Sequence, residues 1–234
     1  MDSFPFSAID LTHPIGPETP QWPGDPDTRR EPHAGLPSHG YTLNAWRIGE
    51  HTGTHLGAPG HRVRDGATVD QLAADELVRP LVVVAAGSRE NDRLAVTVAD
   101  LQAFESKHGA IPVGACVALH TGWDNHWPDQ DRVFERGTDD GFLWPGWSPE
   151  AVDWLVRERN VSVIASDAPD IGAGDDRDLR AGLVCAEHGL PHVENLANLD
   201  RVPPCGSFIV LGALPLQRGT GSPIRAFALT PKST

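Results

Sequence analysis

Short runs of apolar residues alternate along the chain with longer segments whose apolar positions recur at helical spacing. Residues 81–86 (Leu-Val-Val-Val-Ala-Ala) form an unbroken run, which is typical of a strand buried on both faces. Residues 115–120 and 161–165 repeat this pattern. Helical patterns separate these runs, one over 98–107 after Thr97 and one that begins at Ser148-Pro149-Glu150 and runs to about residue 158. This alternation predicts an α/β fold with the site on loops at the strand ends.

The remaining patterns add further elements and one long segment that has no regular pattern. Residues 13–40 are rich in proline and glycine and contain the turn-forming string Trp22-Pro23-Gly24-Asp25-Pro26. A simple connection is shorter than this, so we expect an arm that covers the site or an interface. We expect the whole chain, residues 1–234, to form a single domain. The other expected strands cover 8–12, 41–49, 207–211 and 224–229, and the other helices cover 68–77 and 179–187.

Composition narrows the range of partners and compartments. The formal charge is −13, from 19 basic and 32 acidic side chains, which argues against nucleic acid or an anionic membrane as partner. No apolar run is long enough to cross a bilayer. The three cysteines are far apart and form no CxxC pair, which is typical of reduced, structural cysteines in a cytoplasmic protein. We therefore expect a cytoplasmic protein that binds neither nucleic acid nor a membrane.

Three of the eleven histidines, His51, His55 and His61, fall within eleven residues. Imidazole is the commonest metal ligand and the side chain most easily protonated near neutral pH. On an extended strand His51 and His55 would lie roughly 13 Å apart, whereas a helical turn would bring their Cβ atoms to about 5–6 Å. If both bind one ion, the segment is a turn or short helix, which Gly53 permits. The alternative is two polar histidines on a loop.

The chain resembles the cyclase family, which includes bacterial kynurenine formamidases and isatin hydrolase. The resemblance covers nearly everything from Asp10 to Ala226, and the central motif H-x-G-T-H-x-D-x-P-x-H of that family corresponds to residues 51–61. The other matching blocks are Asp10-Leu11-Thr12-His13-Pro14, Trp22 to Pro26, Thr121-Gly122-Trp123, Pro145-Gly146 with Ser148-Pro149-Glu150-Ala151, Ser166-Asp167-Ala168-Pro169, Glu194-Asn195-Leu196 and Gly221 to Ala226.

This resemblance implies a swivelling β/β/α domain that forms homodimers or homotetramers. It also implies the opening of amide or lactam bonds with a divalent metal, Zn or Mn. By the same resemblance, His51, His55 and Glu194 are metal ligands and His61 transfers a proton. Trp22 lines the substrate pocket by the same resemblance. Aromatic residues serve both substrate pockets and subunit interfaces, so we expect Trp123, Trp127, Trp144 and Trp147 to form a substrate wall, an interface or both.

Two positions depart from the family pattern. Gly57 stands where the family has a bridging Asp, and Gly182 stands where it has a His twelve residues before the Glu of E-N-L. Because two dications need bridging carboxylate charge, we expect no binuclear site. One metal held by His51, His55 and Glu194, or none, remains open. His188 or His192 are possible substitutes for a lost ligand, but we interpret each as a helix-end or surface histidine.

Three functions follow from these observations. The first is a metal-dependent hydrolase that opens an amide, lactam or lactone, with His61 protonating the leaving nitrogen. The second is a metal-independent cyclase or dehydratase that acts on a polyketide-like substrate through His51, His55, His61 and Glu194. The third is a non-catalytic protein that binds a small molecule.

Overall fold

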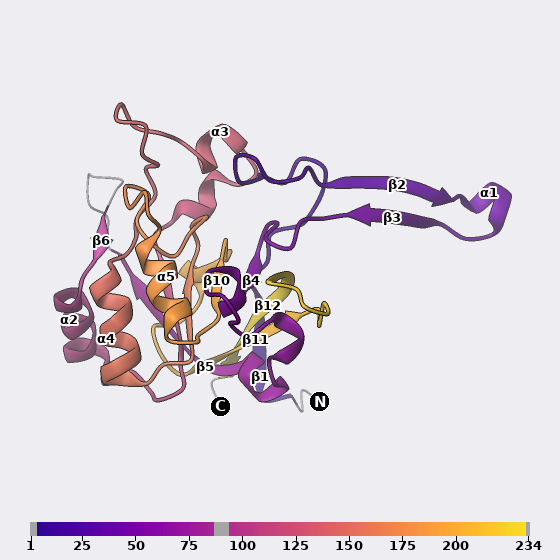
Figure 1. The fold of residues 1–234 in the computed structure, drawn as a ribbon. Helices are drawn as coiled ribbons and strands as arrows, with labels where there is room; N and C mark the ends of the chain where they lie inside the picture. Colours follow the sequence, from indigo (N-terminus) through magenta and orange to yellow (C-terminus); the bar gives the residue numbers. More distant parts are fainter. Residues whose placement is uncertain (1–3, 87–93, 233–234) are drawn as a thin grey trace.

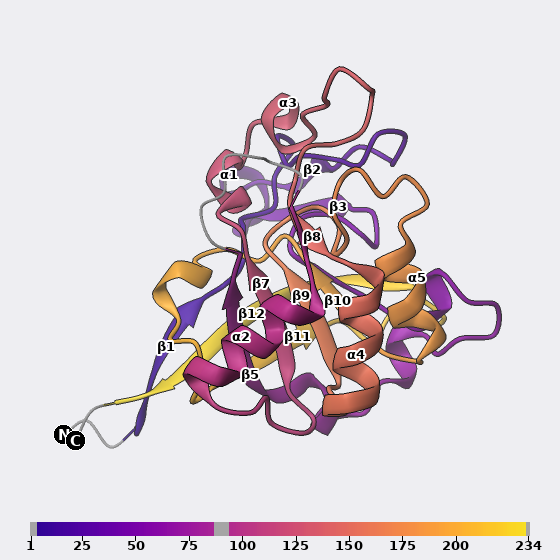
Figure 2. The same ribbon diagram turned by 90° about the vertical axis from the view of Figure 1, so that its left-hand side faces the viewer.

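A mixed β-sheet that closes on itself forms the centre of the molecule (Figures 1 and 2). The computed structural model describes residues 4–86 and 94–232. Within these residues the strand order is β1-β12-β11-β5-β7-β9-β10-β4, and pairing of β12 with β4 closes the ring and leaves β1 outside it. The strands are β1 (Phe6–Asp10), β4 (His55–Gly57), β5 (Val78–Ala85), β7 (Cys116–His120), β9 (Val163–Ser166), β10 (His192–Glu194), β11 (Ser207–Ala213) and β12 (Gly221–Pro231). The expected α/β class is confirmed.

The apolar runs form the parallel part of this sheet, as their pattern predicts. β5, β7, β9 and β10 are parallel neighbours. Successive side chains on a strand point to opposite faces, so each run contributes to two cores. On β5, Leu81 and Val83 pack into the core inside the ring, whereas Val82 and Val84 pack against the helices outside it. This explains why polar and apolar residues do not alternate along these strands.

Three helices cover the outer face of the parallel strands (Figure 2): α2 (Val98–His108), α4 (Pro149–Arg159) and α5 (Arg180–Glu187). The first two begin where the sequence predicts. Thr97 accepts a hydrogen bond from the Asp100 N–H at the start of α2, and Ser148 caps α4 in the same way from Ala151. Leu101, Leu155 and Cys185 are fully buried between these helices and the sheet.

A hairpin of β2 (Arg29–Ala34) and β3 (Leu43–Arg47) projects from the body (Figure 1). A strand near 41–49 is confirmed, and the loop-rich segment 13–40 contains one strand, β2, that the sequence did not predict. The sequence of β2 (Arg-Arg-Glu-Pro-His-Ala) lacks apolar alternation, because most of its side chains face solvent. It is a strand through its backbone pairing with β3. The earlier part of the segment, with Pro20, Trp22 and Asp25, reaches the main cavity.

The expected helix over 68–77 is also wrong, because the backbone becomes extended at Leu72 and leaves two single turns.

Within the described residues no helix exceeds eleven residues, and none has the length and apolar character needed to cross a bilayer. The remaining short elements are α1 (Leu36–His39), α3 (Gln130–Val133), β6 (Ala95–Val96), β8 (Gly146–Trp147), and the 3-10 turns η1 (Pro59–His61), η2 (Val69–Gln71), η3 (Ala74–Leu77), η4 (Trp123–His126) and η5 (Leu199–Arg201).

Candidate functional site

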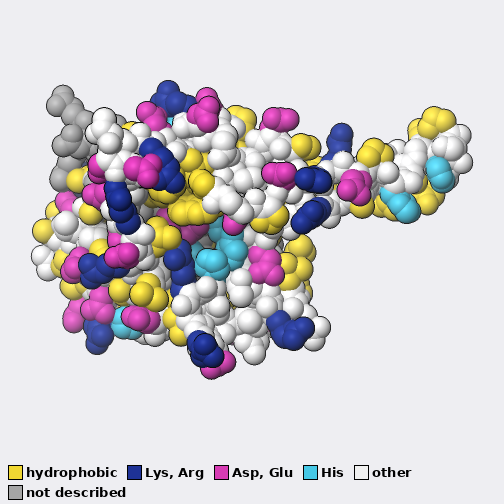
Figure 3. Space-filling model, turned by 45° about the horizontal axis from the view of Figure 1, so that its top comes forward, with side chains coloured by type: hydrophobic (Ala, Val, Ile, Leu, Met, Phe, Trp, Pro, Cys, Tyr) yellow, Lys and Arg dark blue, Asp and Glu magenta, His cyan; other side chains and the backbone are white. Residues whose placement is uncertain are grey.

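A cavity of about 290 Å³ lies beside the paired strands β4 and β10. Figure 3 shows histidine side chains gathered in a hollow of the surface, with apolar side chains beside them. The structure brings four sequence-predicted residues, His51, His55, His61 and Glu194, to the wall of this cavity together with Trp22. His192, Arg62 and Asp170 also line it.

Strand pairing sets the position of the central groups. β4 and β10 are antiparallel, with His55 opposite Glu194 and Gly57 opposite His192. Residues two apart on a strand point to the same face, so these four positions share one surface. His55 Nε2 lies 3.3 Å from Glu194 Oε2, and His192 Nε2 lies 3.3 Å from Glu194 Oε1. One carboxylate therefore holds two imidazoles, one on each oxygen.

His51 and His61 approach this carboxylate group from the turns on either side of β4. As the spacing argument requires, the chain turns between His51 and His55, with Gly53 at φ 65°. The ring centroids of His51 and His55 are 5.0 Å apart, and those of His51 and His61 are 3.9 Å apart. The His51 ring lies against Gly221 on β12, where an added Cβ would lie 2.8 Å from its Nδ1. Glycine is therefore required at this position.

Burial and mutual contact give these groups different protonation states. Burial raises the pKa of Glu194, but the hydrogen bonds from His192 and His55 outweigh it, so its pKa lies well below its usual range. Burial opposes protonation of His55, but the bond to Glu194 raises its pKa. Burial and the neighbouring histidines lower the pKa of His51 to about 2. Burial and the charge of Arg62 lower that of His61 to about 4. At neutral pH the site thus holds the ionised carboxylate of Glu194 and the neutral imidazoles of His51 and His61.

His192 corrects one sequence interpretation. Its side chain is only 3% exposed and lies in the site, so it is neither a helix-end nor a surface histidine. His188, by contrast, follows α5 and pairs with Asp153, as the same interpretation expected. His192 lies two residues before Glu194 on a strand, and the period-two pattern of strands would have placed both on one face. That signal was available in the sequence.

Sequence reasoning also missed Arg62 and Asp170. Asp170 is 2% exposed, and burial together with the charge of Glu194 raises its pKa to about 7. Arg62 Nη2 lies 3.6 Å from Asp170 Oδ2. Among the described residues, the buried Nε of Arg62 has no hydrogen-bond partner. Arg62 therefore places a cationic hydrogen-bond donor in the cavity beside His61. In the sequence, the one signal for this role was the position of Arg62 directly after His61.

Aromatic side chains also line the cavity. Trp22 packs edge-to-face against Phe134, with ring centroids 5.8 Å apart, and both line the cavity. Trp144 lies behind Trp22 and is fully buried. The structure places Trp123 elsewhere: it is 6% exposed, and its indole N–H donates to the Val133 carbonyl. The expected substrate-binding role of Trp123 therefore does not agree with the structure, because packing within η4 and α3 accounts for this residue.

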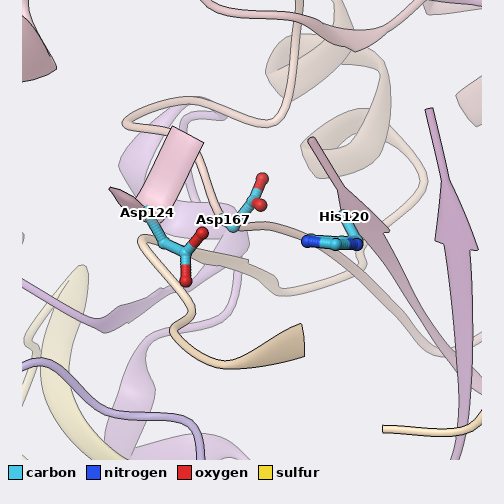
Figure 4. A group of neighbouring side chains, drawn as sticks. All are labelled: His120, Asp124 and Asp167. Atoms are coloured by element: carbon cyan, nitrogen blue, oxygen red, sulfur yellow. The ribbon is translucent and has the colours of Figure 1, made fainter. Parts of the chain in front are cut away.

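A second group of possible metal ligands lies outside the cavity (Figure 4). It consists of His120, Asp124 and Asp167, whose ligand atoms all lie within 4.8 Å of one another. Asp167 follows β9 and already accepts hydrogen bonds from the Thr121 N–H, the Thr121 hydroxyl and the Gly122 N–H. Asp124 accepts one from the Asn198 N–H. These bonds connect the β7–η4 turn to the end of β9 and η4 to the start of η5, which is a structural role.

Comparison with known proteins agrees with this fold and with the sequence motifs. The chain is 33% identical to isatin hydrolase from Roseibium aggregatum over 96% of this chain and 92% of that protein. It is 26% identical to kynurenine formamidase from Salinibacter ruber over 94% of this chain and 96% of that protein. A solved isatin hydrolase bound to the product analogue thioisatinate superimposes with a TM-score of 0.90 at 29% identity, covering 97% of this chain and 94% of that one.

The family model described as "Putative cyclase" matches residues 9–173. The expected class, a hydrolase of this family that acts on carbonyl compounds, is confirmed by these named relatives. Motifs, fold and similarity over almost the whole length thus agree, and the chain belongs to the cyclase family.

Proposed function

We propose that this protein hydrolyses the C–N bond of a small amide or lactam that carries a flat, apolar group. The observation that carries the proposal is the composition of one cavity, which is lined by Trp22 and Phe134 as well as by Glu194 with its imidazoles. An aromatic wall binds a flat ring, and polar groups on rigid strands orient the bond to be broken. The isatin hydrolase and kynurenine formamidase relatives support the same reaction class.

The donors in the cavity fit a divalent metal. His55 Nδ1 donates to the Gly53 carbonyl at 2.9 Å, which leaves its Nε2 facing Glu194; this is the usual arrangement behind a ligating histidine. His51 is neutral at physiological pH, and a neutral ring is the form that binds metal. His51, His55 and Glu194 would hold one ion. When bound, it would polarise the carbonyl and lower the pKa of a bound water.

His61 is suited to move the proton. Burial keeps its ring neutral near pH 7, so its free nitrogen accepts a proton from the attacking water. It then delivers that proton to the nitrogen that leaves when the C–N bond breaks, and the ring returns to its starting state. Its ring lies 3.9 Å from that of His51 and packs beside Arg62. Opening an amide yields a carboxylate, and the Arg62 guanidinium would pair with this new negative charge.

The test is turnover of a defined panel: isatin, N-formylkynurenine and their lactone analogues, followed by mass spectrometry of the products. The proposal expects a product heavier by one water from at least one compound, and loss of this product in His61→Ala. A compound recovered unchanged after tight binding would support the binding-protein alternative. A product formed by ring closure or loss of water would support the metal-independent cyclase or dehydratase. Either result would overturn the hydrolase proposal.

We also propose that two or more copies of the chain associate through the β2–β3 hairpin. An isolated two-stranded hairpin is at best marginally stable in water. Apolar side chains remain exposed along and beside this one, namely Leu36, Tyr41, Leu43, Trp46 and Ile48. Light scattering should give a mass of two or four chains for the wild type and of one for Trp46→Glu. A monomeric wild type would overturn this proposal.

We further propose a cytoplasmic location. The support is the set of cysteines Cys116, Cys185 and Cys205, which are free in the part of the chain that the structure describes. Free, buried thiols are typical of a reducing compartment. Fractionation of cells that produce the untagged protein tests this expectation, and recovery in the secreted fraction would contradict it.

A further inference from the structure

We propose that His192 is a metal ligand of this site and replaces the carboxylate that Gly57 lacks, so that the site favours Zn²⁺ over Mn²⁺. This inference deepens the proposed function, because it rests on a metal in the same cavity. It concerns a residue outside the motif blocks that identify the family.

The register of β4 and β10 carries the first step. His192 and Gly57 are direct cross-strand partners, next to the partners Glu194 and His55. A side chain at position 57 and one at position 192 therefore compete for the same space over the same face. A Cβ built on Gly57 would overlap Cε1 and Nε2 of the His192 ring and lie 3.1 Å from its Nδ1. With His192 present, only glycine fits at position 57, so the two positions are linked.

The environment of the His192 ring supplies the second step. The ring is almost fully buried, and its Nε2 lies 3.3 Å from Glu194 Oε1. Among the described residues, its buried Nδ1 has no hydrogen-bond partner. Buried polar atoms in folded proteins are nearly always paired, so this orphaned atom points to a ligand or ion. His192 also shares Glu194 with His55, which places it among the donors already assigned to the metal.

Gly182 supports the same set of ligands. Gly182 lies on α5, and a Cβ added there would meet no atom of the described chain within 4 Å. The helix thus offers no donor at this position, and the donors come from the β4 and β10 segments: His51, His55, His192 and Glu194. The set has three imidazoles and one carboxylate. Imidazole ligands suit Zn²⁺, whereas Mn²⁺ prefers carboxylate and other oxygen ligands.

The experiment compares metal affinity, measured by calorimetry with Zn²⁺ and Mn²⁺ alone and by the visible absorption of bound Co²⁺. His192→Ala should lower Zn²⁺ affinity by at least about 100-fold and change the Co²⁺ spectrum. His192→Leu keeps apolar bulk over Gly57 and should show the same loss, which separates ligation from packing. His188→Ala is the matched control, because it removes a nearby histidine that faces Asp153, and it should bind Zn²⁺ as the wild type does.

A coupled pair of substitutions sharpens the test. Gly57→Asp alone should destabilise the fold, because its side chain overlaps the His192 ring. Gly57→Asp combined with His192→Ala should recover the melting temperature and bind metal again, with a ratio of Mn²⁺ to Zn²⁺ affinity at least about tenfold higher than in the wild type.

Equal Zn²⁺ affinity in the wild type and both His192 variants would overturn the inference, as would a wild type that binds no Zn²⁺. A stable Gly57→Asp variant with wild-type affinity would do the same. These readouts do not involve turnover. The proposed hydrolysis fails separately, when the wild-type protein with metal added opens none of the panel compounds.

Discussion

Two clusters of histidine and carboxylate side chains lie on the same sheet, and their hydrogen bonds differ. In the cluster of His120, Asp124 and Asp167, backbone N–H groups bind both carboxylates. In the cluster around Glu194, no backbone N–H of the described residues donates to the carboxylate, which contacts the imidazoles of His55 and His192. Its neighbours include two buried atoms, Nδ1 of His192 and Nε of Arg62, that have no hydrogen-bond partner within residues 4–86 and 94–232.

This difference indicates how to separate a functional cluster from a structural one. A carboxylate that accepts hydrogen bonds from backbone N–H groups holds a turn in place, and these hydrogen bonds stabilise the folded protein. A carboxylate that binds only neutral or titratable rings, beside unpaired donors in a cavity, leaves these groups available to a ligand. The short distances between its ligand atoms favour the cluster of His120, Asp124 and Asp167 as a metal site. The hydrogen bonds favour the cluster around Glu194, because its carboxylate is not bonded to a described backbone N–H.

The largest effect is expected from Glu194→Gln. This change removes the negative charge between His55 and His192, and one amide hydrogen must then face an imidazole. We expect kcat/KM to fall by at least about 1000-fold, comparable to the loss of a major electrostatic group in an active site. Steady-state kinetics measure the loss, and circular dichroism checks that the variant is folded. A folded variant with more than a tenth of wild-type activity would contradict the comparison.

His61→Ala should have the next largest effect. It removes the proposed proton carrier and leaves the contacts of Glu194 with His55 and His192 in place. We expect kcat to fall by about 100-fold, the lower range for a lost acid–base group, with little change in metal affinity. Kinetics and calorimetry on the same preparation separate the two quantities. Loss of metal affinity together with kcat would show that His61 acts as a ligand instead.

Asp167→Asn should affect stability and leave the chemistry unchanged. The substitution weakens charged hydrogen bonds from Thr121 and Gly122, each of which contributes about 1.5–3 kcal/mol in comparable cases. We expect the free energy of unfolding to fall by about 2 kcal/mol, and kcat/KM of the folded enzyme to stay within about threefold. Urea denaturation gives the first quantity. A large fall in kcat/KM without loss of stability would make the outer cluster the functional one.

The smallest effect concerns pH. His13 connects the two clusters: its backbone N–H donates to the Thr54 hydroxyl, next to His55, and its ring stacks on Trp127 after η4. Burial lowers its pKa from 6.5 to about 4. The unfolded chain therefore takes up a proton first as pH falls through 6.5, and stability is lost between 6.5 and 4. From pH 7.5 to 5.5 this loss is about 1 kcal/mol.

His13→Phe keeps a stacked ring without a titratable group, so it serves as the matched control for this pH effect. Urea midpoints of both proteins at the two pH values measure the difference. Equal pH dependence in the wild type and His13→Phe would show that His13 does not carry the effect.

The parallel strands and the first part of the site could be predicted from the sequence because each depends on local pattern. The run at 81–86 needs only its own side chains to be identified as a buried strand, and His51, His55 and His61 are close in sequence. β2 could not be predicted, since its pairing with β3 across the hairpin decides its conformation and its side chains mostly face solvent.

Contacts between distant segments account for the other errors. Trp123 was expected in a substrate wall or a subunit interface, and only packing shows that it lies against Val133 while Trp22 lines the cavity. Asp170 and Arg62 are far apart in the chain, and the closure of the ring brings them to one wall. His192 was misinterpreted because Gly189 and Pro191 indicated the end of a helix, although strand periodicity places it beside Glu194.

The metal content of untagged protein, measured by mass spectrometry after Zn²⁺ loading and desalting, tests the central claim most directly. The claim is that the Glu194 cluster, and not the Asp167 cluster, holds the ion. We expect about one Zn²⁺ per chain in the wild type and in Asp167→Asn, and almost none in Glu194→Gln. Retention of the metal by Glu194→Gln together with its loss from Asp167→Asn would contradict the claim.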